Sequence, residues 1–235
     1  MIDIYAVNLC KNENESKISK AIKFLPYEKK EKVSKFLGWK DKERTTLGEL
    51  LIRTIIINTV GISNESISFY KSEYGKPFLN YDYDLHFNIS HSGDWVVCSV
   101  DSRPIGIDIE EIRTIDCEVF EKFFFESEFK QLCKINGIKK MQYFYDLWTL
   151  KESYIKADGR GLSIPLNSFE IINGKDGIKI GANKDNKKYF FKQYNIDDNY
   201  KLSVCATNDK FTDHVIIKKY DEVINEFVVL ACRSN

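Results

Sequence analysis

The spacing of apolar side chains divides the chain into strands and helices. Apolar and polar positions alternate at the start, over residues 2–6, and this pattern predicts a strand. Apolar positions three or four residues apart predict helices over residues 41–59 and 141–157, and the residues after Pro26 predict a shorter one over 28–37. A further helical region is expected over 116–133. The other predicted strands cover 67–70, 85–89, 95–100, 105–110, 169–172, 178–180, 189–194 and 202–206.

Short turns rich in glycine, proline and serine separate these elements. They fall at 74–77 (YGKP), 90–94 (SHSGD), 101–104 (DSRP) and 159–161 (GRG). The second of these reads as the turn of a hairpin. Since no Pro- or Ser-rich linker interrupts the chain, strands and helices belong to one α/β (α+β) assembly.

A faint internal repeat indicates how that assembly is built. TLGE at 46–49, with Arg53, resembles TLKE at 149–152, with Lys156. Chance could produce so short a match. If the match is real, two similar α/β halves, residues 1–103 and 104–235, are related by a pseudo-twofold axis, with the ligand cleft between them.

The strand GIDIE at 106–110 places two carboxylates on one face. In a strand, alternate side chains share a face, so Asp108 and Glu110 lie together, opposite the isoleucines. Gly106 leaves room on the carboxylate face for a ligand or for another backbone. An ordinary solvated strand face is the alternative.

A third carboxylate, Glu152, lies on the predicted helix at 141–157, one turn before Lys156. A surface ion pair is the plain reading of these two residues. Two strand carboxylates and one helix carboxylate also suit a hard cation such as Mg²⁺, which proteins commonly bind together with substrate phosphates. The pattern therefore indicates phosphate chemistry.

Basic and polar residues elsewhere could contact an anion. Lys29 and Lys32 are one helical turn apart, and Lys76 lies in the 74–77 turn, which would hold its side chain in one direction. Ser90 and His91 lie in the 90–94 turn. Ordinary surface lysines and a structural histidine are the alternatives.

Composition limits the partners and the compartment. The 35 basic residues balance the 35 acidic ones, so no overall field favours nucleic acid or membrane. Apolar runs fall short of the about 20 residues that a membrane span needs, and residues 1–9 lack the pattern of a signal peptide. The six cysteines are scattered without a C-x-x-C pair, which favours reduced thiols. We therefore expect a cytoplasmic protein.

Four segments together resemble the phosphopantetheinyl transferases of the surfactin-synthetase type. They are YGKP at 74–77, FNISHSG at 87–93, PIGIDIE at 104–110 and FYDLWTLKESYIKA at 144–157, the last followed by GRGL at 159–162. The resemblance implies a pseudo-twofold α/β fold. It also implies transfer of the 4′-phosphopantetheine arm of coenzyme A, the co-substrate, to a serine of an apo acyl or peptidyl carrier protein, which releases adenosine 3′,5′-bisphosphate.

The resemblance also implies roles for individual residues. Asp108, Glu110 and Glu152 would hold Mg²⁺ against the pyrophosphate, which Lys156 would neutralise. Glu152, or a metal-bound water that it contacts, would take the serine proton. The remaining contacts to the phosphates and adenine of coenzyme A would come from Lys29, Lys32, Arg44, Lys76, Ser90 and His91.

Other functions remain open on the sequence alone. The same carboxylates could serve a Mg²⁺-dependent pyrophosphatase acting on coenzyme A or nucleotides, or the chain could be a non-catalytic module that binds coenzyme A or a carrier. For carrier docking, residues 120–125 and the strands after Gly161 are candidates, although the phenylalanines of 120–125 could equally be core. Two halves in one chain favour a monomer.

Overall fold

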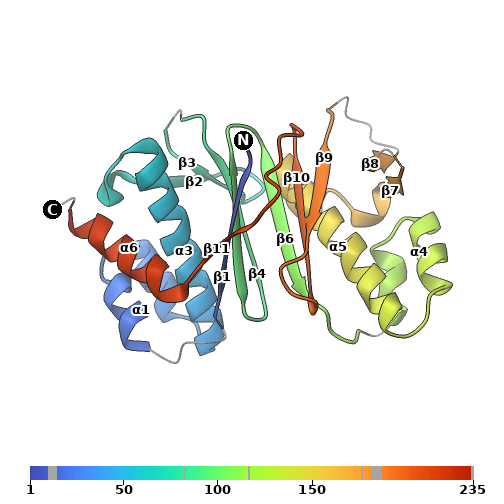
Figure 1. Ribbon diagram of the computed structural model, residues 1–235, viewed down its shortest axis with the longest axis horizontal. Coiled ribbons are helices and arrows are strands. Elements are labelled where there is room, and N and C mark those ends of the chain that lie inside the picture. Colours follow the sequence, from blue (N-terminus) through green and yellow to red (C-terminus); the bar gives the residue numbers. More distant parts are fainter. Residues whose placement is uncertain (10–14, 82, 116, 176, 182–186, 234–235) are drawn as a thin grey trace.

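Helices cover both ends of the molecule, and two β-sheets lie between them (Figure 1). The computed structural model describes residues 1–9, 15–81, 83–115, 117–175, 177–181 and 187–233. Apolar side chains alternate along the strands and recur at helical spacing along the helices, so each sheet has one face for its helices and one face for the other sheet.

The N-terminal half is built on a four-stranded sheet in the order β11-β1-β5-β4. Strands β1 (Asp3–Asn8), β5 (Trp95–Asp101) and β4 (His86–Ser92) are antiparallel neighbours, whereas β11 (Ile216–Lys218) pairs with β1 in parallel. The other N-terminal elements are α1 (Glu15–Ile22), α2 (Tyr27–Ser34), α3 (Trp39–Val60), the short helix η1 (Asn64–Ser66), and the hairpin of β2 (Phe69–Lys71) and β3 (Pro77–Leu79).

The C-terminal half is built on a three-stranded antiparallel sheet, β6-β10-β9, with α5 (Ile138–Asp158) packed on it. Helix α5 is capped at its C-terminus by Gly159, whose φ of 94° lies in the left-handed region that favours glycine. The strands are β6 (Ile105–Glu111), β10 (Tyr200–Ala206) and β9 (Phe190–Tyr194). Around them lie η2 (Cys117–Lys122), α4 (Glu126–Cys133), η3 (Gly161–Ser163), η4 (Leu166–Ser168) and the hairpin of β7 (Glu170–Gly174) and β8 (Gly177–Gly181).

Three apolar clusters hold these layers together. One lies between the N-terminal sheet and α3, with α6 (Tyr220–Cys232) and α1 closing it, and one surrounds α5. The third joins the two sheets and contains the fully buried Ile105, Ile107 and Ile109. The predicted alternation in GIDIE is thus confirmed, because its isoleucines face the other sheet and its polar residues face α5.

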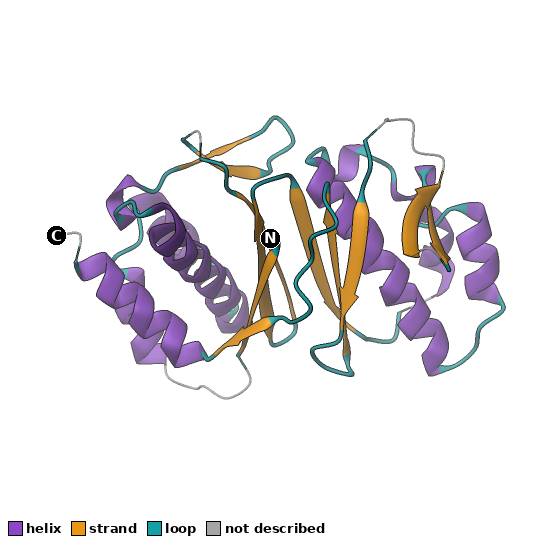
Figure 2. Ribbon diagram, turned by 45° about the horizontal axis from the view of Figure 1, so that its top comes forward, coloured by secondary structure: helices purple, strands orange, loops and turns teal. Residues whose placement is uncertain are grey.

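The predicted arrangement of two similar α/β halves is confirmed, since a long helix lies on a β-sheet in each half (Figure 2). The sequence had assigned all of residues 104–235 to the second half, and the structure differs from this expectation in one segment. The C-terminal segment, red in Figure 1, crosses back to place β11 beside β1 and α6 against α3. The reason is apolar burial, since Phe227 and Val223 complete the N-terminal core.

Several local predictions also change. Helix α2 ends at Ser34 rather than at residue 37, and the helical region expected over 116–133 is divided into η2 and α4, with residue 116 outside the described residues. Phe120 and Phe124, considered for carrier docking, are buried in the core around α5. Helix α6 and β11 had not been predicted.

No helix in the described part of the chain is both long and apolar enough to cross a bilayer. The four cysteines whose side chains the structure describes, Cys98, Cys133, Cys205 and Cys232, are free thiols. Cys10 lies outside the described residues.

Candidate active site

Asp108 on β6 is the most deeply placed acidic residue of the predicted site, with 2% of its surface exposed. Its Oδ1 accepts hydrogen bonds from Ser90 Oγ at 2.9 Å and from Lys156 Nζ at 2.5 Å. Its Oδ2 is buried and has no hydrogen-bond partner among the described residues. Burial raises the pKa of Asp108, and Lys156 and Ser90 offset this only in part.

Glu110 lies two residues farther along the same face of β6. Its Oε2 accepts a hydrogen bond from Ser92 Oγ at 2.8 Å. Partial burial, reinforced by the negative charge of Asp108, raises the pKa of Glu110. The two strand carboxylates therefore repel each other in a partly desolvated place.

Glu152 brings a third negative charge to the same place from α5. Burial raises its pKa to about 7, and the charges of Asp108 and Glu110 act in the same direction, against the favourable effect of Lys156. Three carboxylates that destabilise one another are a setting in which a bound dication is favourable.

The three carboxylates have the chemistry that a divalent cation needs, but in this structure they do not form a complete coordination site. The donor atoms are all carboxylate oxygens, as Mg²⁺ prefers, and the buried Oδ2 of Asp108 is available as a ligand. Within the described ranges, however, no three His, Cys, Asp or Glu side chains are gathered closely enough to hold an ion. The metal site thus stays a prediction.

Lys156 faces the strand carboxylates from the last turn of α5. Besides Asp108, its Nζ donates to Ser90 Oγ at 3.2 Å and to the carbonyl oxygen of Ile107 at 3.4 Å. The structure thus brings Ser90, Asp108 and Lys156 into direct contact.

Side chains of β4 bridge the two sheets at this point. Asn88 Oδ1, Ser90 Oγ and Ser92 Oγ accept hydrogen bonds from the amides of Ile107, Ile109 and Glu111 on β6, respectively. The hairpin turn predicted over 90–94 is therefore shorter than expected, because β4 continues to Ser92. Its alternation directs Ser90 and Ser92 to β6, and His91 to the opposite face.

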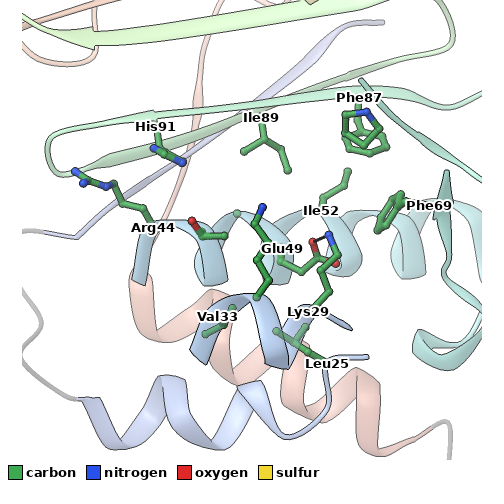
Figure 3. Close-up of a pocket in the computed structure, with 14 residues that line it drawn as sticks. Leu25, Lys29, Val33, Arg44, Glu49, Ile52, Phe69, Phe87, Ile89 and His91 are labelled. Atoms are coloured by element: carbon green, nitrogen blue, oxygen red, sulfur yellow. Dashed lines mark hydrogen bonds and ion pairs between the residues drawn. The ribbon is translucent and has the colours of Figure 1, made fainter. Parts of the chain in front are cut away.

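That opposite face borders a cavity of about 190 Å³ in the N-terminal half (Figure 3). Arg44 and His91 lie at one end of the cavity, and Phe69 and Phe87 at the other. The full lining is Leu25, Lys29, Lys32, Val33, Arg44, Thr45, Gly48, Glu49, Ile52, Phe69, Pro77, Phe87, Ile89 and His91. The structure thus brings together four residues that the sequence had assigned to coenzyme A: Lys29, Lys32, Arg44 and His91.

The polar residues at the cavity wall are held in place. Arg44 donates to the carbonyl oxygen of Gly93 at 2.6 Å and to Asp41 at 2.5 Å. Desolvation and the guanidinium of Arg44 lower the pKa of His91, so its imidazole is neutral near pH 7. Lys29 forms an ion pair with Glu49 at 2.6 Å.

Lys76 does not line this cavity. Its Nζ donates to the carbonyl oxygens of Ile105, at 3.0 Å, and of Lys156, at 2.5 Å, so it connects the β2–β3 hairpin to the C-terminal half. Burial lowers its pKa to about 8. In this structure its ammonium binds backbone rather than facing the cavity.

The sequence had not singled out three residues that support the site: Glu49, Arg53 and Asn88. The internal repeat did contain a signal for two of them, since Glu49 and Arg53 occupy the positions that match Glu152 and Lys156. Asn88 and Ser92 accept hydrogen bonds from β6, which is distant in sequence, and no local sequence pattern predicts these contacts.

Comparisons with known proteins point to one family. Residues 104–205 match the profile of the 4′-phosphopantetheinyl transferase superfamily, and residues 12–103 match a profile described as 4′-phosphopantetheinyl transferase, N-terminal. The 4′-phosphopantetheinyl transferase Sfp of Bacillus subtilis (strain 168) is 37% identical over 222 residues, covering 94% of this chain and 99% of that protein. The 4′-phosphopantetheinyl transferase gsp of Aneurinibacillus migulanus is 43% identical over 204 residues, covering 86% of this chain and 84% of that protein.

Among solved structures, this chain is similar to a holo-(acyl-carrier-protein) synthase from Bacillus anthracis in complex with CoA (3′,5′-ADP). The match covers 44% of this chain and 93% of that protein's chain. Its TM-score is 0.40 and its identity 19%.

The family matches define the class of this protein, a transferase of a phosphate-containing group. The chain belongs to the 4′-phosphopantetheinyl transferase superfamily, and it resembles the Bacillus members over almost its whole length. It is an enzyme that transfers phosphopantetheine.

Proposed function

We propose that this enzyme transfers the 4′-phosphopantetheine group of coenzyme A to a serine of an apo acyl or peptidyl carrier protein, in a reaction that depends on Mg²⁺. The single observation that carries the proposal is the contact of Asp108 on β6 with Lys156 on α5, beside Glu110 and Glu152. It supports the proposal because it brings a cationic side chain to carboxylates that could hold a metal ion.

Two regions of the protein would bind different parts of coenzyme A. Lys29, Lys32, Arg44 and His91 at the cavity suit the 3′-phosphate and adenine end of coenzyme A, because the cavity is cationic at its wall and apolar inside. Asp108, Glu110 and Glu152 would hold the metal ion. When bound, Mg²⁺ would screen the negative charge of the pyrophosphate.

The protein side chains supply the proton transfers. The serine oxygen attacks the β-phosphorus of coenzyme A, and the bond from that phosphorus to the leaving adenosine 3′,5′-bisphosphate breaks. Glu152, or a metal-bound water that it contacts, would accept the serine proton, since a carboxylate that itself binds Mg²⁺ is a weak base. Lys156 neutralises the departing phosphate.

Mass spectrometry of a carrier protein tests this function. The enzyme is incubated with coenzyme A, Mg²⁺ and an apo carrier, and a gain of roughly 340 Da, the mass of the pantetheine arm with its phosphate, is expected on the carrier. A parallel reaction with EDTA should give no gain. Cleaved coenzyme A with an unmodified carrier would contradict the transfer and indicate a pyrophosphatase.

The oligomeric state belongs to the same proposal. Ser90 of one half contacts Asp108 of the other within one chain, so a monomer suffices to build the site. The cytoplasmic location stays a prediction.

A further inference from the structure

Three charged side chains form a row that leads from the protein interior to the wall of the cavity. Arg53 on α3 is 1% exposed, and its Nε donates to Glu49 Oε1 at 2.7 Å. The other oxygen of that carboxylate, Oε2, accepts from Lys29 Nζ at 2.6 Å. Glu49 is therefore held between two cations, with one of its oxygens on each.

Arg53 is the fixed end of this row. Its Nη1 donates to the carbonyl oxygen and to Oδ1 of Asn64, both at 3.1 Å, and its Nη2 donates to the carbonyl oxygen of Ile67 at 3.4 Å. Asn64 is itself held, since its Nδ2 donates to the carbonyl oxygen of Phe24 at 2.8 Å. A buried guanidinium with these contacts cannot turn away without leaving a charge unpaired, so it fixes the direction of Glu49.

Lys29 is the adjustable end of the row. Its side chain is 36% exposed, and an unrestrained lysine there would populate many rotamers. Two contacts select one direction, namely the ion pair with Glu49 and the ring of Phe69, whose centroid lies 5.5 Å from Lys29 Nζ. Lys29, Glu49 and Phe69 all line the cavity (Figure 3).

The corresponding pair on α5 behaves differently. Glu152 and Lys156 repeat the spacing of Glu49 and Arg53, yet burial leaves Glu152 with a raised pKa. Both oxygens of Glu49 are bound to cations, which suits its carboxylate to hold a neighbouring side chain in place.

We propose that Glu49, fixed by Arg53, positions Lys29 for the 3′-phosphate of coenzyme A, so that a carboxylate in the cavity strengthens the binding of an anion. This inference rests on the proposed function. Simple electrostatics predicts that Glu49 weakens the binding instead, because a carboxylate beside a phosphate repels it. The two explanations therefore predict opposite changes in the KM for coenzyme A when Glu49 loses its charge.

The test compares coenzyme A with dephospho-coenzyme A in the full-length enzyme. We expect Glu49→Gln to raise the KM for coenzyme A about fivefold, the scale of losing one well-placed ionic contact, and to leave the KM for dephospho-coenzyme A unchanged. The loss of affinity should appear in the KM for coenzyme A rather than in kcat. An unchanged or lowered KM for coenzyme A, with the melting temperature preserved, would overturn the proposal.

A second variant and a double variant guard against an indirect effect. Glu49→Asp keeps a charge beside Arg53 but is one methylene too short to reach both cations, so it should also raise the KM for coenzyme A. In a Lys29→Ala background only the repulsion remains, and there Glu49→Gln should lower the KM. If it raises KM in that background by the same factor, Glu49 does not act through Lys29 and the proposal is wrong.

Two further variants serve as controls for this test. Glu43→Gln is the matched control, because Glu43 lies on the same helix but accepts its hydrogen bond from Tyr220 of α6, at 2.6 Å, away from the cavity. It should leave both KM values unchanged. If Lys29→Ala weakens coenzyme A and dephospho-coenzyme A equally, the assignment of the cavity to the 3′-phosphate fails, and that failure is distinct from a failure of Glu49.

Discussion

Asp108 shows how the site depends on single atoms. One oxygen of its carboxylate accepts from Ser90 and Lys156, whereas the other is buried without a partner in the described part of the chain. An unpaired buried oxygen costs about 1–3 kcal/mol, so its retention in a stable core is best explained by a ligand that it contacts during function.

We therefore expect Asp108→Asn to lower kcat at least about a hundredfold, the scale of losing a key charge stabiliser, while the fold persists. Asparagine has the same shape, and its oxygen can still accept from Ser90. Steady-state transfer assays and thermal melting measure the two effects. The matched control is Asp101→Asn, a buried aspartate of β5 that accepts from Asn208, and it should retain activity. Near-normal turnover in Asp108→Asn would remove that residue from the site.

Glu152 makes the stability of the metal-free enzyme depend on pH. Its pKa is about 7 when folded and 4.5 in the unfolded reference, so the folded state binds more protons in between. The free energy of unfolding should thus fall as the pH rises from about 4.5 to about 7. Melting in EDTA across this range checks the trend, and Glu152→Gln should flatten it. An unchanged slope in Glu152→Gln would show that other groups cause the trend.

At the scale of elements, the site depends on the close contact of β6 with α5. A Cβ on Gly106 would lie 2.1 Å from the carbonyl oxygen of Ser153 and 2.4 Å from the amide of Ala157. The space that the sequence left to a ligand or a backbone is thus filled by the backbone of α5. This helix carries Glu152 and Lys156, so its distance from β6 sets the geometry of the site.

Gly106→Ala should push α5 away from β6. We expect a loss of stability of about 1–3 kcal/mol or more from overpacking, with a fall in kcat because Glu152 and Lys156 move with the helix. Urea unfolding and transfer assays measure these effects. Gly174→Ala on β7 is the control, since a Cβ there meets nothing within 4 Å and its φ is not positive. Equal effects of the two substitutions would contradict this explanation.

The elements that could be predicted from the sequence are those with their own periodicity. The alternation around Asp108 and the helical spacing around Glu152 are local, and both the strand and the helix are confirmed. The partners of Lys76 and the bridging role of Ser92 depend on contacts between β4, the β2–β3 hairpin and the C-terminal half. Local patterns do not encode such contacts, so Lys76 was expected at the cofactor, but in this structure its ammonium binds backbone carbonyls.

At the scale of the whole molecule, the C-terminal segment is part of the N-terminal core. Phe227 and Ala231 of α6 are fully buried against residues of α3 and α1, and β11 extends the sheet beside β1. The boundary at residue 103 therefore separates neither the two sheets nor the two cores, because β11 and α6 belong to the N-terminal half.

Substitutions in α6 should distinguish its two faces. Phe227→Ala removes a fully buried ring and should lower the free energy of unfolding by about 3–5 kcal/mol. Val229→Ala, at a site that is 49% exposed, should change it by less than about 0.5 kcal/mol. Urea titration of both variants measures the difference. Similar midpoints for the two would mean that α6 does not stabilise the core.

The parallel pairing of β1 with β11 has a consequence for biosynthesis. Translation proceeds from the amino end, so β1 emerges early, yet β11 and α6 emerge only after the strands of the other sheet. The half that begins to leave the ribosome first is thus completed after the strands of the second half have emerged. Until then, the apolar surface that α6 will cover stays open to water and to chaperones.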